Sequence, residues 1–255
     1  MKDLSRWGIA MAFSLLALFP GTALAQITVI TSGGFATPLK TALPEFEKAA
    51  GISVTVVLGK SQGAGPDTIS AQLGRGVSAD VVILSREGLN DLISENRIAK
   101  NSDVDLAKTP LGMAVKAGAP KPDISTVEGF KNTLLRAKSI TYPSSTTGIY
   151  MATKLFPQLG IAEALAGKST NAGVVTVAKG ETEIAIQPVS ELLHVAGTDF
   201  VGTLPQSIQY VSVFSAGRVA GSGKDDQAKQ LISFLASEKA GEAMRNSGME
   251  PLRRR

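Results

Sequence analysis

The sequence of 255 residues contains no cysteine and a single histidine, His194. The absence of cysteine excludes a disulfide framework, a thiolate zinc site, a cysteine nucleophile and a lipidated N-terminal cysteine. A single histidine excludes a metal site built from several imidazoles and makes any Ser-His-Asp triad depend on that one residue. Because His194 lies in an apolar Leu-Leu-His-Val context, we interpret it as a packed or surface residue rather than a catalyst.

The sequence also has little net charge once its two ends are set aside. Its formal net charge is +4 at pH 7. All of this charge lies near the two ends, in Lys2, Asp3 and Arg6 and in the arginine run 253–255. The body between them is therefore neutral. A neutral body argues against a nucleic-acid-binding groove, and we expect no nucleic-acid partner. We interpret the arginine run as a solvated terminus.

Long hydrophobic runs are scarce too. The apolar run 7–18 is shorter than the roughly 20 residues that span a bilayer, and segment 174–193 is interrupted by charged residues and a proline. The first run follows a basic segment and precedes the small-residue cleavage pattern Ala23-Leu24-Ala25. Residues 1–25 therefore predict a signal peptide cleaved before Gln26 rather than an uncleaved anchor. We expect an exported protein, periplasmic if the source is Gram-negative.

What the chain does contain is a regular alternation of short β-rich runs and helical patterns. Such alternation is typical of βαβ units on a mostly parallel sheet, and it occurs twice, before and after about residue 115, which predicts two similar lobes. The expected strands are 27–30, 53–58, 80–84, 111–116, 139–142, 183–187 and 209–215. The expected helices are 38–50, 67–73, 87–96, 125–138, 147–159, 172–178, 225–237 and 239–246.

Five of the expected strand-to-helix loops are rich in glycine and hydroxyl side chains. In open α/β sheets ligands bind at such loops, where backbone N–H groups, hydroxyls and helix N-termini can donate to an anion. Each loop alone could be a plain helix cap or turn, but the set in both halves favours an anion site. The loops are 31–35, 59–65, 85–86, 144–148 and 187–190.

Two common nucleotide motifs are absent from these loops. In the loop 59–65, Lys60 precedes the glycine run, and no Gly-Lys-Ser/Thr follows at the spacing of a phosphate-binding P-loop. The loop 31–35 follows an expected strand but lacks the Gly-x-Gly-x-x-Gly dinucleotide pattern. We therefore expect no nucleotide cofactor, and no other cofactor or metal is indicated.

Several segments together resemble type II periplasmic solute-binding proteins, in particular the molybdate-binding-protein-like branch that serves ABC importers. The first strand 27–30 with its small-residue loop, the Gly-x-x-Ala-Asp-hydrophobic run 76–84 and the Lys-Gly-Glu segment 178–186 are similar to that branch. Segments 201–205 and 234–237 are similar to its return strand and final helices. The resemblance covers nearly all of the mature chain.

The resemblance implies a two-lobe α/β fold, the type II periplasmic-binding-protein fold, with the ligand in a cleft between the lobes. Lobe 1 would comprise residues 26–112 plus 213–255, and lobe 2 residues 113–212. Two crossing strands, near 111–116 and 209–215, would join the lobes and let them close on a ligand. The expected partners are a small anionic ligand and an ABC permease, and we expect a monomer.

The sequence departs from the molybdate pattern where the ligand would bind. The serine of the family's first loop aligns with Gly34 and the tyrosine of its late strand aligns with Pro188, while Ser61 corresponds to the second-loop serine in a longer loop. These departures favour a di- or tricarboxylate over molybdate, with extra donors suited to carboxylates. The residues expected to bind the ligand are Ser32, Gly33, Gly34, Lys60, Ser61, Gln62, Arg86, Ser144, Ser145, Thr146, Gln187 and Ser190.

Three functions fit this sequence. The first is a binding protein that delivers a small anion to an ABC importer. The second is an enzyme, because an aconitate isomerase resembles these proteins and moves a proton between allylic positions with one base and no cofactor. The third is a sensor that passes ligand occupancy to a membrane receptor. Conceivable proton carriers are Lys60, Tyr142, Tyr150 and Glu191.

Overall fold

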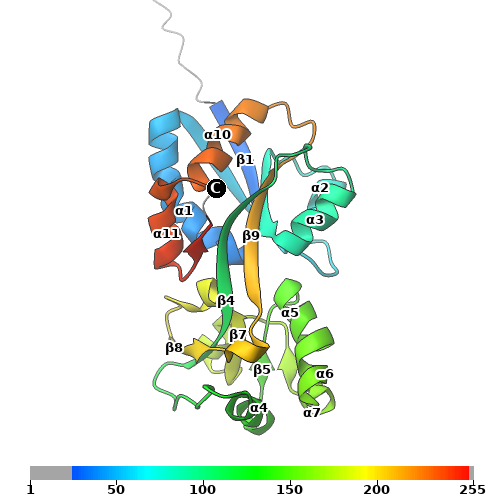
Figure 1. The fold of residues 1–255 in the computed structure, drawn as a ribbon, viewed down its shortest axis with the longest axis vertical. Coiled ribbons are helices and arrows are strands. Elements are labelled where there is room, and N and C mark those ends of the chain that lie inside the picture. The colour runs from blue at the N-terminus through cyan, green and yellow to red at the C-terminus, as the bar shows by residue number, and fades with distance from the viewer. Residues whose placement is uncertain (1–24, 253–255) are drawn as a thin grey trace, which may run out of the picture.

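The computed structural model describes residues 25–252, so the arginine run and all of the expected signal peptide except Ala25 lie outside the described residues. Two lobes are stacked along the long axis of the molecule (Figure 1). A sheet with the strand order β2-β1-β3-β9-β4-β7-β5-β6 runs through both lobes, and β8 and β10 each pair with β4. The expected two-lobe α/β fold is confirmed.

Lobe 1 is built on a mixed sheet, to which the short β10 also adds by pairing with β4 at Ala107 and Lys108. β1 (Ala25–Ser32) pairs in parallel with β2 (Ile52–Gly59) and β3 (Val81–Ser85), and the antiparallel β9 (Val211–Arg218) and the first half of β4 (Val104–Lys116) continue the sheet. α1 (Gly33–Ala50), α10 (Asp225–Leu235) and α11 (Glu238–Asn246) bury one face around Phe35, Leu231 and Met244. α2 (Ile69–Gly74) and α3 (Arg86–Ser94) bury the other face.

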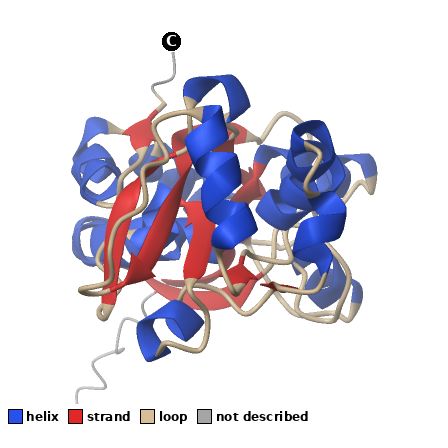
Figure 2. Ribbon diagram, turned by 90° about the horizontal axis from the view of Figure 1, so that it is seen from below, coloured by secondary structure: helices blue, strands red, loops and turns tan. Residues whose placement is uncertain are grey.

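Lobe 2 uses the second half of β4. There β4 pairs antiparallel with β7 (Ile184–Pro188) and β8 (Thr198–Thr203), and the short β5 (Ile140–Thr141) pairs in parallel with β7 and with β6 (Ser169–Thr170). Figure 2 shows helices packed around the strands when the molecule is seen from below. The helices of lobe 2 are α4 (Val127–Arg136), α5 (Thr146–Tyr150), a π-helical turn (Met151–Leu155), α6 (Phe156–Leu159), α7 (Ala162–Ala166), α8 (Val175–Lys179) and α9 (Val189–Leu192).

Two strands connect the lobes (Figure 1). β4 pairs with β9 as far as Pro110 and with β7 from Leu111 onward, so the chain passes from one lobe to the other between these two residues. Just before the returning strand β9, the side chain of Gln209 accepts from the backbone N–H of Leu111 at 2.7 Å and donates to its carbonyl at 3.2 Å. The exact lobe boundaries at residues 112/113 and 212/213 stay a prediction.

The start of α1 differs from the expected one. The sequence predicted a helix from Pro38, but α1 begins at Gly33 and contains Pro38 and Pro44. An internal proline removes one backbone hydrogen bond and crowds the preceding turn. The extended helix buries Phe35, Pro38 and Leu39 on one face, and this burial offsets the loss. The consequence for function is that residues 33–35 are the first turn of a helix rather than a free loop.

Several short elements were not predicted. They are α7, α9, β6, a 3₁₀ turn (Gln206–Ile208) and β10 (Glu250–Pro251). None of the described helices is long and apolar enough to cross a membrane.

Candidate functional site

A cavity of about 160 Å³ lies where the loops of the two lobes meet. The loops after β1, β2 and β3 come from lobe 1, and the segments that precede α5 and follow β7 come from lobe 2. The cavity is lined by Ser32, Gly33, Gly34, Gly59, Lys60, Ser61, Ser85, Pro143, Ser145, Thr146, Thr147, Pro188, Glu191, Ser212 and Phe214. Seven of the twelve residues expected to bind the ligand are therefore brought together here: Ser32, Gly33, Gly34, Lys60, Ser61, Ser145 and Thr146.

The N-terminus of α1 forms one wall of this cavity. Ser32 is the N-cap, but its side chain caps no backbone N–H, and its buried Oγ atom has no hydrogen-bond partner. The first turn of α1 contains no acidic side chain. The unpaired N–H groups and the positive end of the helix dipole are thus available to an anion.

Close packing explains why residue 34 is glycine. A Cβ atom at Gly34 would lie 2.2 Å from Cζ of Phe214, a separation that real Cβ contacts do not reach. Phe214 is buried in the core of lobe 1 and also lines the cavity. The ring therefore occupies the space that a serine side chain at position 34 would need.

The loop donors of the two lobes bond largely to one another. The hydroxyl of Thr146 donates to Oε1 of Gln62 at 3.0 Å and shares a hydrogen bond with Ser85 Oγ at 2.8 Å. The hydroxyl of Ser145 accepts from the backbone N–H of Gln62 at 3.2 Å. Gln62 does not line the cavity, and neither does Ser144, whose carbonyl lies close to Gly63. These contacts hold the two lobes together across the mouth of the cavity.

The cations near the cavity are already paired. Nζ of Lys60 lies 2.9 Å from Oδ2 of Asp67, and this hydrogen bond lowers the pKa of the Asp67 carboxyl. Arg86 does not line the cavity and pairs with Asp103 at 2.9 Å and with Asp105. Lys60 is thus the one lysine or arginine among the described residues that line this cavity.

The remaining wall carries a carboxyl group. Glu191 of α9 lines the cavity, and its Oε1 would lie 3.3 Å from a Cβ atom at Gly33, so it faces the N-terminus of α1. Nε2 of Gln187 donates to Oε2 of Glu191 at 2.5 Å. Burial raises the pKa of the Glu191 carboxyl above its usual value, and the Gln187 hydrogen bond opposes the increase. In the described part of the chain, Glu191 has no ion-pair partner.

Two further predicted residues lie beside this carboxyl group. Gln187 and Ser190 line a second hollow that shares Gly33 and Glu191 with the cavity. Oε1 of Gln187 and Oγ of Ser190 are buried without a hydrogen-bond partner. His194 lines the same hollow, and its Nε2 lies 3.0 Å from the carbonyl of Asn246. With Ser32 Oγ, three buried polar atoms near the contact between α1 and α9 therefore lack a hydrogen-bond partner.

The two tyrosines that the sequence suggested as proton carriers, Tyr142 and Tyr150, do not line this cavity. The hydroxyl of Tyr150 donates to the carbonyl of Ile208, and its ring stacks on Tyr210 with centroids 4.8 Å apart. Tyr142 packs edge-on against Phe156 in the core of lobe 2.

Phe214, Ser85, Pro143 and Ser212 line the cavity but were not predicted as site residues. Among the described residues, no cluster of three or more histidine, aspartate or glutamate side chains could hold a metal ion.

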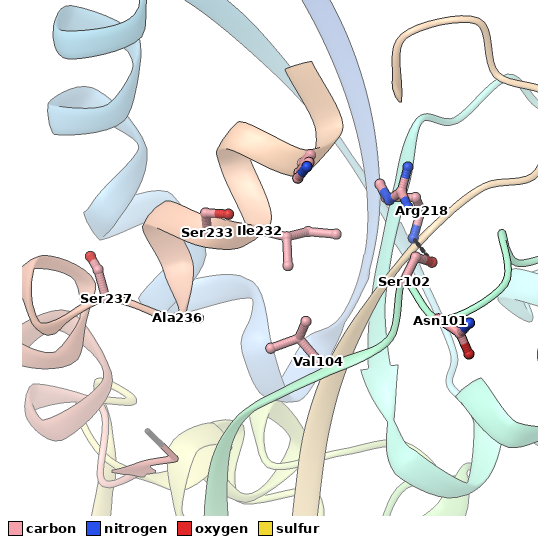
Figure 3. Close-up of a pocket in the computed structure, with 9 residues that line it drawn as sticks. Asn101, Ser102, Val104, Arg218, Ile232, Ser233, Ala236 and Ser237 are labelled. Carbon is pink, nitrogen blue, oxygen red and sulfur yellow. Dashed lines mark hydrogen bonds between the residues drawn. The ribbon is translucent and has the colours of Figure 1, made fainter. Parts of the chain in front are cut away.

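A separate cavity of about 360 Å³ lies within lobe 1, between α10 and the start of β4 (Figure 3). Several of its polar groups have partners: the backbone N–H of Arg218 donates to Ser102 Oγ, and the guanidinium of Arg218 pairs with Asp225. The hydroxyl of Ser237 donates to the carbonyl of Phe234. No residue of lobe 2 contributes to this lining, so lobe closure would not enclose a ligand there.

Comparisons with known proteins agree with this architecture. Residues 27–250 match the family of bacterial extracellular solute-binding proteins. The chain is 37% identical to an aconitate isomerase of a Pseudomonas species over 243 residues. This match covers 93% of this chain and 91% of the relative.

Solved structures of binding proteins share the fold at low sequence identity. The periplasmic molybdate-binding protein of Azotobacter vinelandii superposes with a TM-score of 0.66 at 17% identity, covering 88% of this chain and 98% of the other. The sulfate-binding protein of Mycobacterium tuberculosis superposes with a TM-score of 0.68 at 18% identity, covering 89% of this chain and 87% of the other.

Proposed function

The chain belongs to the family of bacterial extracellular solute-binding proteins, and we propose that it uses the cleft of this fold as an active site. The proposed reaction is the interconversion of cis- and trans-aconitate by an allylic proton shift. The relative with 37% identity is an aconitate isomerase, which supports this choice over simple transport. The reaction needs a positioned base and an anion clamp, and no cofactor.

The single observation that carries the proposal is the carboxyl group of Glu191. In a protein that only binds a polycarboxylate, an ionised acidic side chain in the site would weaken binding, because like charges repel. A general base, in contrast, needs a carboxylate whose pKa is raised toward the working pH. Glu191 lines the cavity, has a raised pKa and has no ion-pair partner among the described residues.

The proton balance of the reaction requires one group that can take and give a proton. In our proposal Glu191 takes a proton from the methylene carbon of aconitate, and the electron pair of the broken C–H bond moves into the allylic system. The double bond shifts, and a proton is returned to the carbon at the other end. The substrate carries one negative charge for each ionised carboxyl group, and the allylic carbanion intermediate carries one more; in our proposal hydrogen-bond donors stabilise this charge.

Donors for the substrate carboxylates are available on both lobes. The N-terminus of α1 with Ser32 would hold one carboxylate, and Lys60 and Ser61 a second. A third would meet the N-terminus of α5, whose N-cap Ser145 makes no side-chain cap. We propose that Gly34 and Pro188 leave molybdate without two donors, at about 1–3 kcal/mol each, so that it binds at least about tenfold more weakly than a tricarboxylate.

A second candidate function is a carrier that delivers the anion to an ABC permease. The match to a solute-binding family over residues 27–250 favours it, because binding proteins of this kind work by enclosing a ligand between two lobes. Either function places the mature chain in the periplasm, as the expected signal peptide does, and either is compatible with a monomer.

One experiment separates the two candidates. The purified mature protein is incubated with trans-aconitate, and the appearance of cis-aconitate is followed by proton NMR, with calorimetric titrations of trans-aconitate, citrate and molybdate in parallel. Turnover supports the isomerase. Tight binding without turnover supports the carrier, and submicromolar molybdate binding without carboxylate binding contradicts both.

A further inference from the structure

The amide of Gln187 is unusual because only one of its two ends is used. The side chain is 5% exposed, and its Nε2 donates to Glu191 while its Oε1 is buried without a partner. A buried carbonyl oxygen without a donor costs free energy, so such a group calls for an explanation. The backbone of Gln187 is fixed, because β7 pairs Gln187 with Gly112 of β4.

The chemistry of an amide suggests that explanation. An ionised carboxylate only accepts hydrogen bonds, whereas a protonated carboxyl group also donates one. A glutamine side chain carries a donor and an acceptor, so it can serve either form after a turn of about 180° about its last bond. A lysine or arginine in the same place would favour only the ionised form, and a second carboxyl group only the protonated form.

We propose that Gln187 is a positioning residue that holds Glu191 in both of its protonation states. This inference rests on the proposed function for its catalytic meaning. While Glu191 is ionised, Nε2 of Gln187 donates to Oε2, as in the structure. After Glu191 has taken the proton from substrate carbon, the amide turns and its Oε1 accepts from the new O–H group. The proton moves between substrate carbon and Glu191 only, and Gln187 neither gains nor loses one.

The surroundings leave this role to Gln187. The elements packed against α9 are α1, β4, β7 and β8. None of their titratable groups lines the cavity, and His194, which lines the neighbouring hollow, contacts the carbonyl of Asn246 instead. Lys60 is the one other titratable side chain of the cavity wall among the described residues, and it pairs with Asp67. The titratable groups on the packed elements are Lys40, Glu45, Glu47, Lys48, Asp105, Lys108, Lys116 and Asp199.

The test measures the ionisation of Glu191 directly. Protein labelled with ¹³C at the glutamate side-chain carboxyl carbons is titrated by NMR without substrate, and the Glu191→Gln variant assigns the Glu191 signal. In Gln187→Leu both hydrogen bonds are lost while burial stays. Because the charge-assisted bond to the ionised carboxylate is the stronger of the two, its loss dominates, and the midpoint of the Glu191 titration should move upward by about one pH unit. Gln187→Met, which is flexible and of similar size, repeats the test if Gln187→Leu does not fold.

A matched control removes a different buried polar atom. The hydroxyl of Thr133 on α4 is also buried without a partner, but it does not line the cavity, so Thr133→Val should leave the Glu191 titration unchanged. An unchanged midpoint in both Gln187 variants would overturn the proposal. Because this titration needs no substrate, it can succeed even if the wild-type protein does not isomerise aconitate, and the two failures are distinguishable.

If the wild-type protein does turn over aconitate, the same variants give a second readout. The acid limb of the pH–rate profile should move to higher pH together with the NMR midpoint, and kcat should fall while KM changes little. A variant whose kcat falls with an unshifted profile would show that Gln187 serves only to pack the site, which contradicts the positioning role.

Discussion

Restoring a serine at position 34 tests whether packing against Phe214 is what excludes the molybdate-type donor. A Cβ atom there would lie 2.2 Å from Cζ and 2.7 Å from Cε1 of Phe214, and that ring is 4% exposed. Phe214 also contacts Phe35, with ring centroids 6.2 Å apart, so a shift of the ring would disturb that contact. Gly34→Ser should therefore destabilise the protein through overpacking, by about 1–3 kcal/mol.

The assay is thermal denaturation of the mature chain followed by circular dichroism. For a domain of this size, 1 kcal/mol corresponds to about 2–4 °C in Tm, so Gly34→Ser should lower Tm by about 2–12 °C. Gly167→Ser is the matched control, because nothing lies within 4 Å of the place its Cβ would take. Its Tm should change little.

A double-mutant cycle identifies the cause. Phe214→Leu opens space beside residue 34, so the combined variant should be more stable than the sum of the two single changes predicts, with a coupling of about 1 kcal/mol or more. Strictly additive effects, or equal Tm values for Gly34→Ser and Gly167→Ser, would refute the packing explanation.

Three other predictions follow from the same structure. Thr146→Val removes the hydroxyl that forms hydrogen bonds with Ser85 and Gln62 across the lobes, and the loss should weaken the contact between the lobes by about 1–3 kcal/mol. Solution scattering of the ligand-free variant should therefore show a larger radius of gyration than wild type. An unchanged radius would contradict the role of these contacts. Because burial raises the pKa of Glu191 in the folded state, its contribution to stability is present at low pH and is lost as pH rises through the folded value, so Glu191→Gln should gain Tm relative to wild type as the pH rises above 4.5, the ordinary pKa of the group; a difference that is constant with pH would speak against a titrating carboxyl with a raised pKa. Sequencing of exported protein should find Gln26 first, and an N-terminus at Met1 would exclude the cleaved signal peptide.

Hydrophobic periodicity was enough to predict the main elements of the fold. The strand 27–30 and the helices 225–237 and 239–246 match β1, α10 and α11 closely, because each has a regular apolar face that packs in one core. The start of α1 was wrong because Pro38 is a helix-start signal in sequence, whereas burial of Phe35 extends the helix past it. Short elements such as α7 and α9 hold too few residues for a periodic signal, and their placement depends on the rest of the fold.

The sequence predicted which loops form the candidate site, but not which side chains in and around it pair with one another. Glycine and hydroxyl residues after expected strands identified Ser32, Lys60 and Ser145 on the cavity wall. The sequence could not show that Arg86 pairs with Asp103 and Asp105, because that contact depends on where β4 begins relative to α3. The sequence offered Glu191 as one of four proton carriers, but its place beside Gln187 depends on the turn from β7 into α9.

The rate of aconitate isomerisation by Glu191→Gln, measured beside wild type, tests the central claim most directly. Glutamine keeps the size of the side chain and cannot take a proton, so turnover of trans-aconitate to cis-aconitate should fall by about 10²–10⁴-fold while calorimetric binding of trans-aconitate is retained or tightened. Turnover at the wild-type rate in Glu191→Gln would show that another group carries the proton and would contradict the account.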